Sequence, residues 1–269
     1  MRNSRERLGT AAFRLGYAAI VAFLLLPLLV VVVTSFSASS QLVFPPESYT
    51  MASYLAFFEN NAWLEAFDNS LIVGLGTTVV ATILGVTAAF GQEIDDGAAG
   101  RVLVPLVLLP LLIPPVIFGV TLLVYFNELG LQDTYLSLIL AHTLWATPLV
   151  YFVMRSVFSR FDWQQLDAAR DLGAGPIRSF VHVVLPNVKH GIFVGALLAF
   201  IVSLQEFVMA LFLSGDSTAT IPVVAWNTLR DSLDPIVSVV STFLILISIV
   251  ALLLAVVATN LQWVAKQLS

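Results

Sequence analysis

The chain contains no cysteine and little charge. Only 11% of its 269 residues are Asp, Glu, Lys or Arg, whereas a soluble domain carries about a quarter. The missing cysteine excludes disulfides and thiol catalysis. The missing charge removes the polar surface that a water-soluble fold of this length needs. Basic runs of the kind that bind nucleic acid are also absent, so we expect no nucleic-acid partner.

Catalytic motifs are missing as well. The sequence has no nucleotide-binding loop of the form GxxxxGK[ST], no HExxH and no GxSxG. Its three histidines, His142, His182 and His190, are not spaced with carboxylates as metal ligands are. We therefore expect no catalytic residue, no metal site and no cofactor in this chain, and a conduit, carrier or scaffold in preference to an enzyme.

What the chain does contain is apolar sequence. Hydrophobic residues make up 59% of it, and the mean hydropathy is +0.95. Several apolar runs are long enough to cross ~30 Å of hydrocarbon, and none alternates as a strand does, so helices must span the membrane. We predict an all-α integral membrane protein with six transmembrane helices in one domain, 1–269. The predicted spans are 13–36, 69–91, 102–127, 134–155, 189–213 and 236–263. The first could be a signal peptide, but its long apolar run favours a retained anchor.

The twelve cations predict the orientation of these spans. If the N-terminus is cytoplasmic, eleven of them fall on the cytoplasmic side and only Arg230 falls outside, which is a strong positive-inside bias. Both termini and the loop 156–188 are then cytoplasmic. The outer stretch 37–68 is expected to lie along the membrane interface. The eleven cytoplasmic cations are Arg2, Arg5, Arg7, Arg14, Arg101, Arg155, Arg160, Arg170, Arg178, Lys189 and Lys266.

The loop 156–188 carries paired helix stop and start signals. Asp162 can cap a short helix, with Gln165 at its third position, and Gly173 can supply the left-handed residue that ends it. Pro176 is a good first residue for a second helix. An ordinary loop that packs only on its own bundle is the alternative, but such loops are usually shorter. The pattern favours a compact elbow to which another protein docks.

A spaced motif in this loop resembles a known family. The chain reads DAA at 167–169, then three residues, Gly173, nine residues, Val183, one residue, and LP at 185–186. This resembles the cytoplasmic motif of binding-protein-dependent ABC importer permeases, which reads EAA, three residues, G, nine residues, I, one residue, LP. Every interval matches, and both departures, Asp167 for glutamate and Val183 for isoleucine, are conservative. Other passages, among them SLQEF in the fifth span, resemble the spermidine/putrescine-type branch of these permeases.

The resemblance implies a type I importer permease in a bacterial inner membrane, where it forms the transmembrane pathway for a small solute, with a polyamine as the first expectation. It implies a second permease subunit, identical or related, two ATP-binding subunits that hold ATP and Mg²⁺, and an extracytoplasmic solute-binding protein. In the family the motif forms a coupling helix that docks on the ATPase. The residues that the resemblance assigns to this segment are Leu166, Asp167, Ala168, Ala169, Arg170, Asp171, Leu172, Gly173, Leu185 and Pro186.

Four residues are candidates for the pathway through the membrane: Ser203, Gln205, Glu206 and His142. A carboxylate such as Glu206 costs at least about 2.5–3.5 kcal/mol inside a span unless it faces a polar cavity or a partner. It is either a cation-attracting group on the substrate route or a protonated or hydrogen-bonded structural group. His142 is either functional or hydrogen-bonded to a neighbouring helix. The rival function, an ion-gradient-driven secondary transporter or channel, would need more buried ionisable residues than these.

Two further patterns concern helix packing. Gly191, Gly195, Ala199 and Ser203 recur at four-residue intervals, which lets two helix backbones approach closely. The prolines of the third span predict bends in it. Bent spans that line a route can act as gates, and bends that only suit packing are equally expected.

Overall fold

The computed structural model describes residues 4–39, 41–94 and 97–268 of the chain. Arg2, one of the cations used for orientation, lies outside these ranges. The described residues are almost entirely helical and contain no β-strand, only one isolated bridge between Ser37 and Tyr49. Among these residues, five helices are long and apolar enough to cross a membrane, and the number of spans is six if one bent pair of helices counts as a single span. The predicted all-α membrane fold is confirmed.

The chain divides into two compact units, and the first combines residues 1–61 with 225–246. It contains α1 (Ser4–Thr34), α2 (Ala52–Glu59) and the first part of α12 (Ile236–Leu268). The Thr34 hydroxyl donates a hydrogen bond to Ser238 Oγ over 3.0 Å. The rings of Tyr54 and Phe57 lie 5.9 and 5.3 Å from that of Phe243. These contacts join the end of α1 and α2 to the start of α12.

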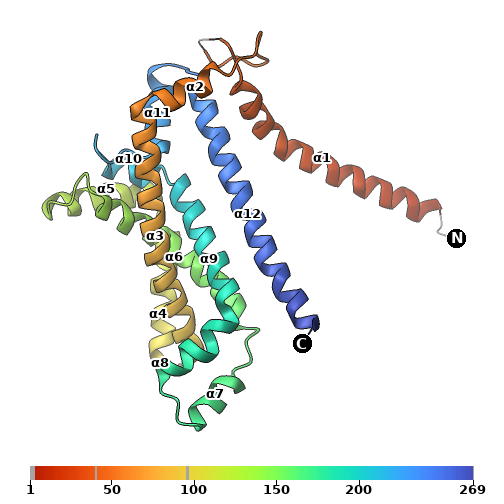
Figure 1. Cartoon of the computed structure of the whole chain (residues 1–269), viewed down its shortest axis with the longest axis vertical. Coiled ribbons are helices and arrows are strands. Elements are labelled where there is room, and N and C mark those ends of the chain that lie inside the picture. Colours follow the sequence, from red (N-terminus) through yellow and green to blue (C-terminus); the bar gives the residue numbers. More distant parts are fainter. Residues whose placement is uncertain (1–3, 40, 95–96, 269) are drawn as a thin grey trace. The chain divides into compact units, whose positions relative to one another are not determined.

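The second unit is a helical bundle around α3 (Asn61–Ile94), α6 (Tyr135–Phe158) and α9 (Leu185–Gln205), as Figure 1 shows. Small residues let these helices approach. A Cβ atom on Gly85 of α3 would lie 2.7 Å from Val150 of α6, and one on Gly195 of α9 would lie 3.2 Å from the same valine. The predicted close approach of the small-residue stripe to a second helix is therefore confirmed, and its partner is α6.

Two spans of this unit are broken. The predicted span 102–127 consists of α4 (Ala98–Leu108), the 3₁₀ turn η1 (Leu109–Leu112) and α5 (Pro115–Glu128), which meet at an angle of 100°. The predicted span 189–213 is interrupted at residues 206–207, so that α9 is followed by the short α10 (Val208–Leu213). The segments beyond the two breaks, α5 and α10, pack together. A Cβ atom on Gly119 would lie 2.5 Å from the Phe212 ring.

Several predicted boundaries shift. Helix α3 begins at Asn61 and not at residue 69, so Trp63 is a buried helical residue with 3% exposure. The second short helix of the predicted elbow is the start of a longer one. Helix α8 (Pro176–Ser179) continues through the π-helical turn η2 (Phe180–Val184) into α9. Helix α11 (Ile221–Asp231) follows the loop 214–220.

Candidate functional site

The motif segment lies on α7 (Gln164–Asp171) and the turn after it, at one end of the second unit (Figure 1). Its start differs from the prediction, because Trp163 occupies the cap position and Asp162 Oδ1 accepts a hydrogen bond from the Gln164 N–H over 3.1 Å. Its end is as predicted. Gly173 is left-handed, with φ of +84°, and its N–H donates to the Arg170 carbonyl over 2.8 Å.

Helix α7 has one buried and one exposed face. Leu166 is 2% exposed and packs into the core of the bundle with Phe158 and Val184. It therefore anchors the segment and is not part of an exposed docking surface, contrary to the expectation from the motif. Two apolar side chains just after α7 are exposed among the described residues: Leu172, which follows its last residue, is 89% exposed, and Ile177 of α8 (Pro176–Ser179) is 80% exposed.

The remaining motif residues surround this exposed end. Leu185 and Pro186 begin α9, where Leu185 is half-buried and Pro186 is exposed. Within α7, Ala169 is half-buried. The exposed motif residues are Asp167, Ala168, Arg170, Asp171, Leu172, Gly173 and Pro186. Exposed apolar side chains beside small and charged ones make a surface on which another protein can pack closely.

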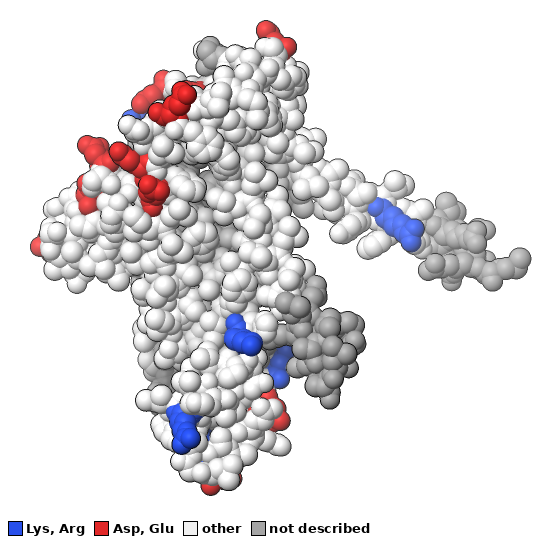
Figure 2. Space-filling model, viewed as in Figure 1, with Lys and Arg blue, Asp and Glu red and all other residues white. Residues whose placement is uncertain are grey.

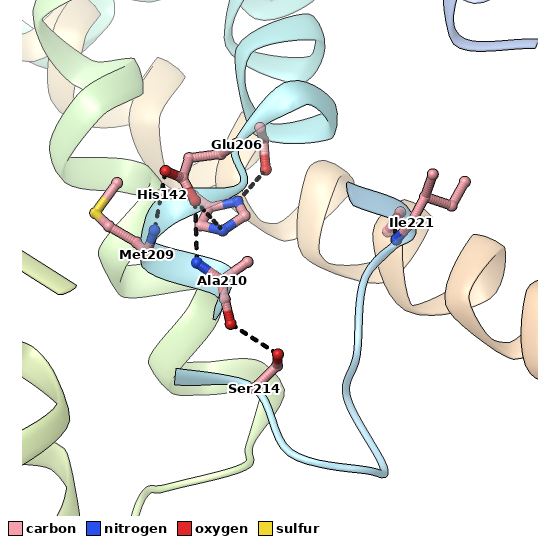
Figure 3. Close-up of polar contacts among 8 residues, drawn as sticks. His142, Glu206, Met209, Ala210, Ser214 and Ile221 are labelled. Carbon is pink, nitrogen blue, oxygen red and sulfur yellow. Dashed lines mark hydrogen bonds and ion pairs between the residues drawn. The ribbon is translucent and has the colours of Figure 1, made fainter. Parts of the chain in front are cut away.

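A second polar constellation lies at the break between α9 and α10 (Figure 3). It brings together Ser203, His142 and Glu206, which are 4%, 1% and 11% exposed. His142 Nδ1 lies 2.8 Å from Ser203 Oγ, and His142 Nε2 lies 3.5 Å from Glu206 Oε2. The Glu206 carboxyl oxygens accept hydrogen bonds from the N–H groups of Met209 and Ala210, each over 3.1 Å.

Gln205 does not join this constellation. Its side chain is exposed, and its Nε2 donates a hydrogen bond to Ser248 Oγ of α12 over 3.1 Å. The two adjacent polar residues at the break therefore differ in role. Glu206 accepts hydrogen bonds from backbone N–H groups of α10, and Gln205 bonds to α12.

A polar clamp that sequence reasoning missed lies at the opposite end of the same unit. Asp133, between α5 and α6, accepts hydrogen bonds from the Gly215 N–H (2.8 Å) and from the hydroxyls of Thr218 (2.5 Å) and Ser217 (3.0 Å). Its backbone is left-handed, with φ of +55°, a conformation that Asp and Asn tolerate better than most residues. An Asp in a short turn between two apolar runs was the available signal. The clamp fixes the loop 214–220 to the α5–α6 turn.

The clamp predicts a pH-dependent stability. Burial alone would raise the pKa of Asp133, but the hydrogen bonds from Thr218, Gly215 and Ser217 outweigh it and lower the pKa below 3.8. Because the folded pKa is depressed, the carboxylate stabilises the fold above pH 3.8, and the contribution is lost as the pH falls through the folded value. We expect Asp133→Asn, which keeps the left-handed backbone, to cost about 1–3 kcal/mol at pH 7. Thermal unfolding in detergent measures it.

The control for this variant is Asp216→Asn, in the same loop but with an exposed side chain. It is expected to change stability by less than about 0.5 kcal/mol. The difference between the two variants should shrink as the pH falls below 3.8. If Asp133→Asn unfolds like the unmodified protein at pH 7, the clamp does not stabilise the loop.

The two ends of this unit differ in exposed charge, because acidic side chains gather at one end and both signs are present at the other, as Figure 2 shows. The acidic side chains at the α7 end include Asp162, Asp167 and Asp171. Exposed Glu65, Asp68, Glu128 and Asp216 lie at the end that carries the clamp. The exposed cations Arg160, Arg170, Arg178 and Lys189 lie at the end that carries α7. These features define a multi-span membrane protein with a different chemical surface at each end.

Comparison with known proteins identifies the family. Residues 81–266 match the model of the binding-protein-dependent transport system inner membrane component. The chain belongs to this family. It is 32% identical over 235 residues to the putrescine transport system permease protein PotI of Escherichia coli K12, covering 83% of this chain and 82% of PotI. It is 26% identical over 232 residues to the spermidine/putrescine transport system permease protein PotC of the same strain, covering 86% and 88%.

A solved structure shows the same fold. A bacterial ABC transporter involved in the import of the acidic polysaccharide alginate matches with a TM-score of 0.73 at 16% identity, over 97% of this chain and 98% of the matched one. The chain is thus a multi-pass permease subunit of an ABC importer, with an all-α fold.

Proposed function

We propose that α7 is the coupling helix through which an ATPase on another chain drives this permease. The observation that carries the proposal is the exposed apolar pair Leu172 and Ile177 at the end of the motif segment. Apolar side chains at this exposure are favourable only when a partner covers them. Buried Leu166 fixes the segment to the bundle core, so a push on α7 is passed to α6 and α9.

The difference in exposed charge supports an orientation in which the α7 end is cytoplasmic. Cationic side chains favour the cytoplasmic side of a membrane protein, and they gather at the α7 end of the second unit. The clamp end, with its exposed carboxylates, then faces outward, where a solute-binding protein delivers the substrate. A second permease subunit completes the pathway, and two ATPase subunits hold ATP and Mg²⁺.

For the substrate we propose a small polyamine. The support is the similarity to PotI and PotC, whose names describe putrescine and spermidine transport. The exposed acidic side chains at the clamp end would raise the local concentration of a cationic solute. The exposed residue at the break, Gln205, is neutral.

The coupling role is tested by placing a bulky residue at Gly173. A Cβ atom there would meet nothing within 4 Å, so the side chain of Gly173→Phe starts in open space. Phenylalanine is strained in the left-handed backbone at this position, and its side chain blocks the docking surface. We expect about a tenfold loss of ATPase association and of putrescine uptake in proteoliposomes, equivalent to about 1.4 kcal/mol. Co-purification of the ATPase and uptake of labelled putrescine measure the two effects.

The matched control is Gly130→Phe. Gly130 is also left-handed, with φ of +67°, and also has open space around it, but it lies in the turn after α5 at the other end of the unit. It carries the same backbone cost without touching the docking surface. Equal losses in both variants would contradict the coupling role. Uptake in vesicles that lack any ATPase would favour a secondary transporter, and uptake of a neutral sugar in place of putrescine would overturn the polyamine assignment alone.

A further inference from the structure

A buried histidine of α6, His142, lies beside the break between α9 and α10, and its Nε2 atom has no hydrogen-bond partner among the described residues. His142 is 1% exposed, and among the described residues its Nε2 makes no hydrogen bond within normal limits. A buried N–H without an acceptor costs about 1–3 kcal/mol. Glu206 Oε2, 3.5 Å away, is an acceptor that this nitrogen faces (Figure 3).

The tautomer of the ring follows from its two neighbours. Ser203 Oγ can either donate to or accept from His142 Nδ1 across 2.8 Å. Both oxygens of Glu206 already accept backbone N–H groups, from Met209 and Ala210. If Nδ1 carried the proton while Glu206 is ionised, the lone pair of Nε2 would face an acceptor oxygen and the two would repel. If Ser203 donates to Nδ1, Nε2 carries the proton and points it at Glu206.

We propose that His142 is the positioning residue for the break. As the neutral Nε2–H tautomer, it receives a hydrogen bond from Ser203 and directs Glu206 onto the first amides of α10. Glu206 in turn satisfies N–H groups that the interruption of the span leaves without helical acceptors. Ser203 lies in the last turn of α9, and His142 lies on α6, so the ring connects the helices on which the break depends.

The consequence for transport concerns α10. This helix packs on α5 through Phe212 and Gly119, and the Asp133 clamp joins the loop after α10 to the turn after α5. The two segments therefore form one body, and the break at residues 206–207 is where this body joins α9. A misplaced Glu206 would change the direction of α10 and with it the route beside exposed Gln205. This consequence rests on the proposed transport function, whereas the tautomer does not.

The tautomer is measured directly. The chain has three histidines, so ring ¹⁵N-labelled histidine in the full-length chain, purified in lipid nanodiscs with its partner subunits, gives a small set of signals. The His142 signals are those that His142→Gln removes. We expect the ¹⁵N shifts of a neutral ring protonated at Nε2. A neutral ring protonated at Nδ1, or a doubly protonated ring, overturns the proposal whether or not the complex transports.

Matched variants test the positioning role. The amide nitrogen of His142→Gln reaches the place of Nε2, whereas that of His142→Asn reaches only the place of Nδ1. We expect the Gln variant to keep at least about half of the ATP-driven uptake, and the Asn variant to lose about tenfold, the factor for one hydrogen bond to a charged group. In a Glu206→Gln background the Asn substitution should cause no further loss.

The opposite order of the two His142 variants, or additive losses in the double variant, would show that the ring only fills space. Both outcomes overturn the positioning role. A failure of all variants and of the unmodified chain to transport would instead count against the proposed function, and the ¹⁵N measurement would still decide the tautomer.

Discussion

Replacing Leu172 and Ile177 together by aspartate is expected to abolish association with the ATPase. These side chains are 89% and 80% exposed and lie at the end of α7 and in the first turn of α8. Apolar anchors at the centre of an interface are worth about 2 kcal/mol or more each, so two of them correspond to about a thousandfold in affinity. ATPase co-purification and ATP-driven uptake should both fall below detection. The thermal unfolding of the permease itself should not change, because neither side chain packs in the core.

Two controls separate docking from folding. Leu129→Asp makes the same type of substitution, with one negative charge, at a 53% exposed leucine in the turn at the opposite end of the unit, and it should leave ATPase association intact. Leu166→Ala removes a buried side chain on α7 itself. It should lower the free energy of unfolding by about 2–5 kcal/mol. If the double aspartate variant still retains the ATPase, the exposed face of α7 is not the docking surface.

The membrane fold and the coupling segment were predictable because their signals are local. Span length and composition depend on consecutive residues, and six apolar runs predict six spans without knowledge of packing. The left-handed Gly173 and the helix start at Pro176 likewise follow from the conformational limits of single residues. The four-residue spacing of Gly191, Gly195 and Ala199 predicts a close helix contact for the same reason.

The breaks were less predictable because they depend on tertiary contacts. The prolines of the third span indicate bends, but not the 100° angle at which α4 and η1 meet α5. The interruption at residues 206–207 contains no proline or glycine. It is stabilised by the Glu206 carboxyl group, which accepts hydrogen bonds from the N–H groups of Met209 and Ala210, and by the approach of His142 from α6. A continuous apolar run therefore predicts an unbroken span there, because its sequence does not reveal which amides a side chain will cap.

Which side chains of a short helix are buried could not be predicted from the sequence either. Motif spacing places Leu166 and Leu172 on the same segment, and both were expected to take part in docking. Only the packing of α7 against Phe158 and Val184 shows that Leu166 is buried while Leu172 is not. Asp133 was missed because its three donors lie more than eighty residues away along the chain. Whether the motif and pathway residues act as proposed stays a prediction.

The α3–α6 contact gives a large expected effect on folding. A Cβ atom on Gly85 would lie 2.7 Å from Val150 Cβ and 3.0 Å from the backbone nitrogen of Tyr151. A flexible side chain could move aside, but the backbone of α6 cannot do so without displacing the helix. We expect Gly85→Leu to lower the free energy of unfolding by about 3 kcal/mol, at the upper end of overpacking costs. Thermal unfolding in detergent and the yield of folded protein measure this loss.

The matched variant is Gly91→Leu in the same helix. A Cβ atom on Gly91 would meet nothing within 4 Å, so leucine there adds no clash, and the higher helix propensity of leucine should leave stability unchanged or raise it by about 0.5 kcal/mol. If α3 tolerated no larger side chain at either glycine, both variants would be destabilised equally. A specific contact destabilises only Gly85→Leu, and it should also displace α6, which carries His142, so that uptake falls even in the protein that still folds.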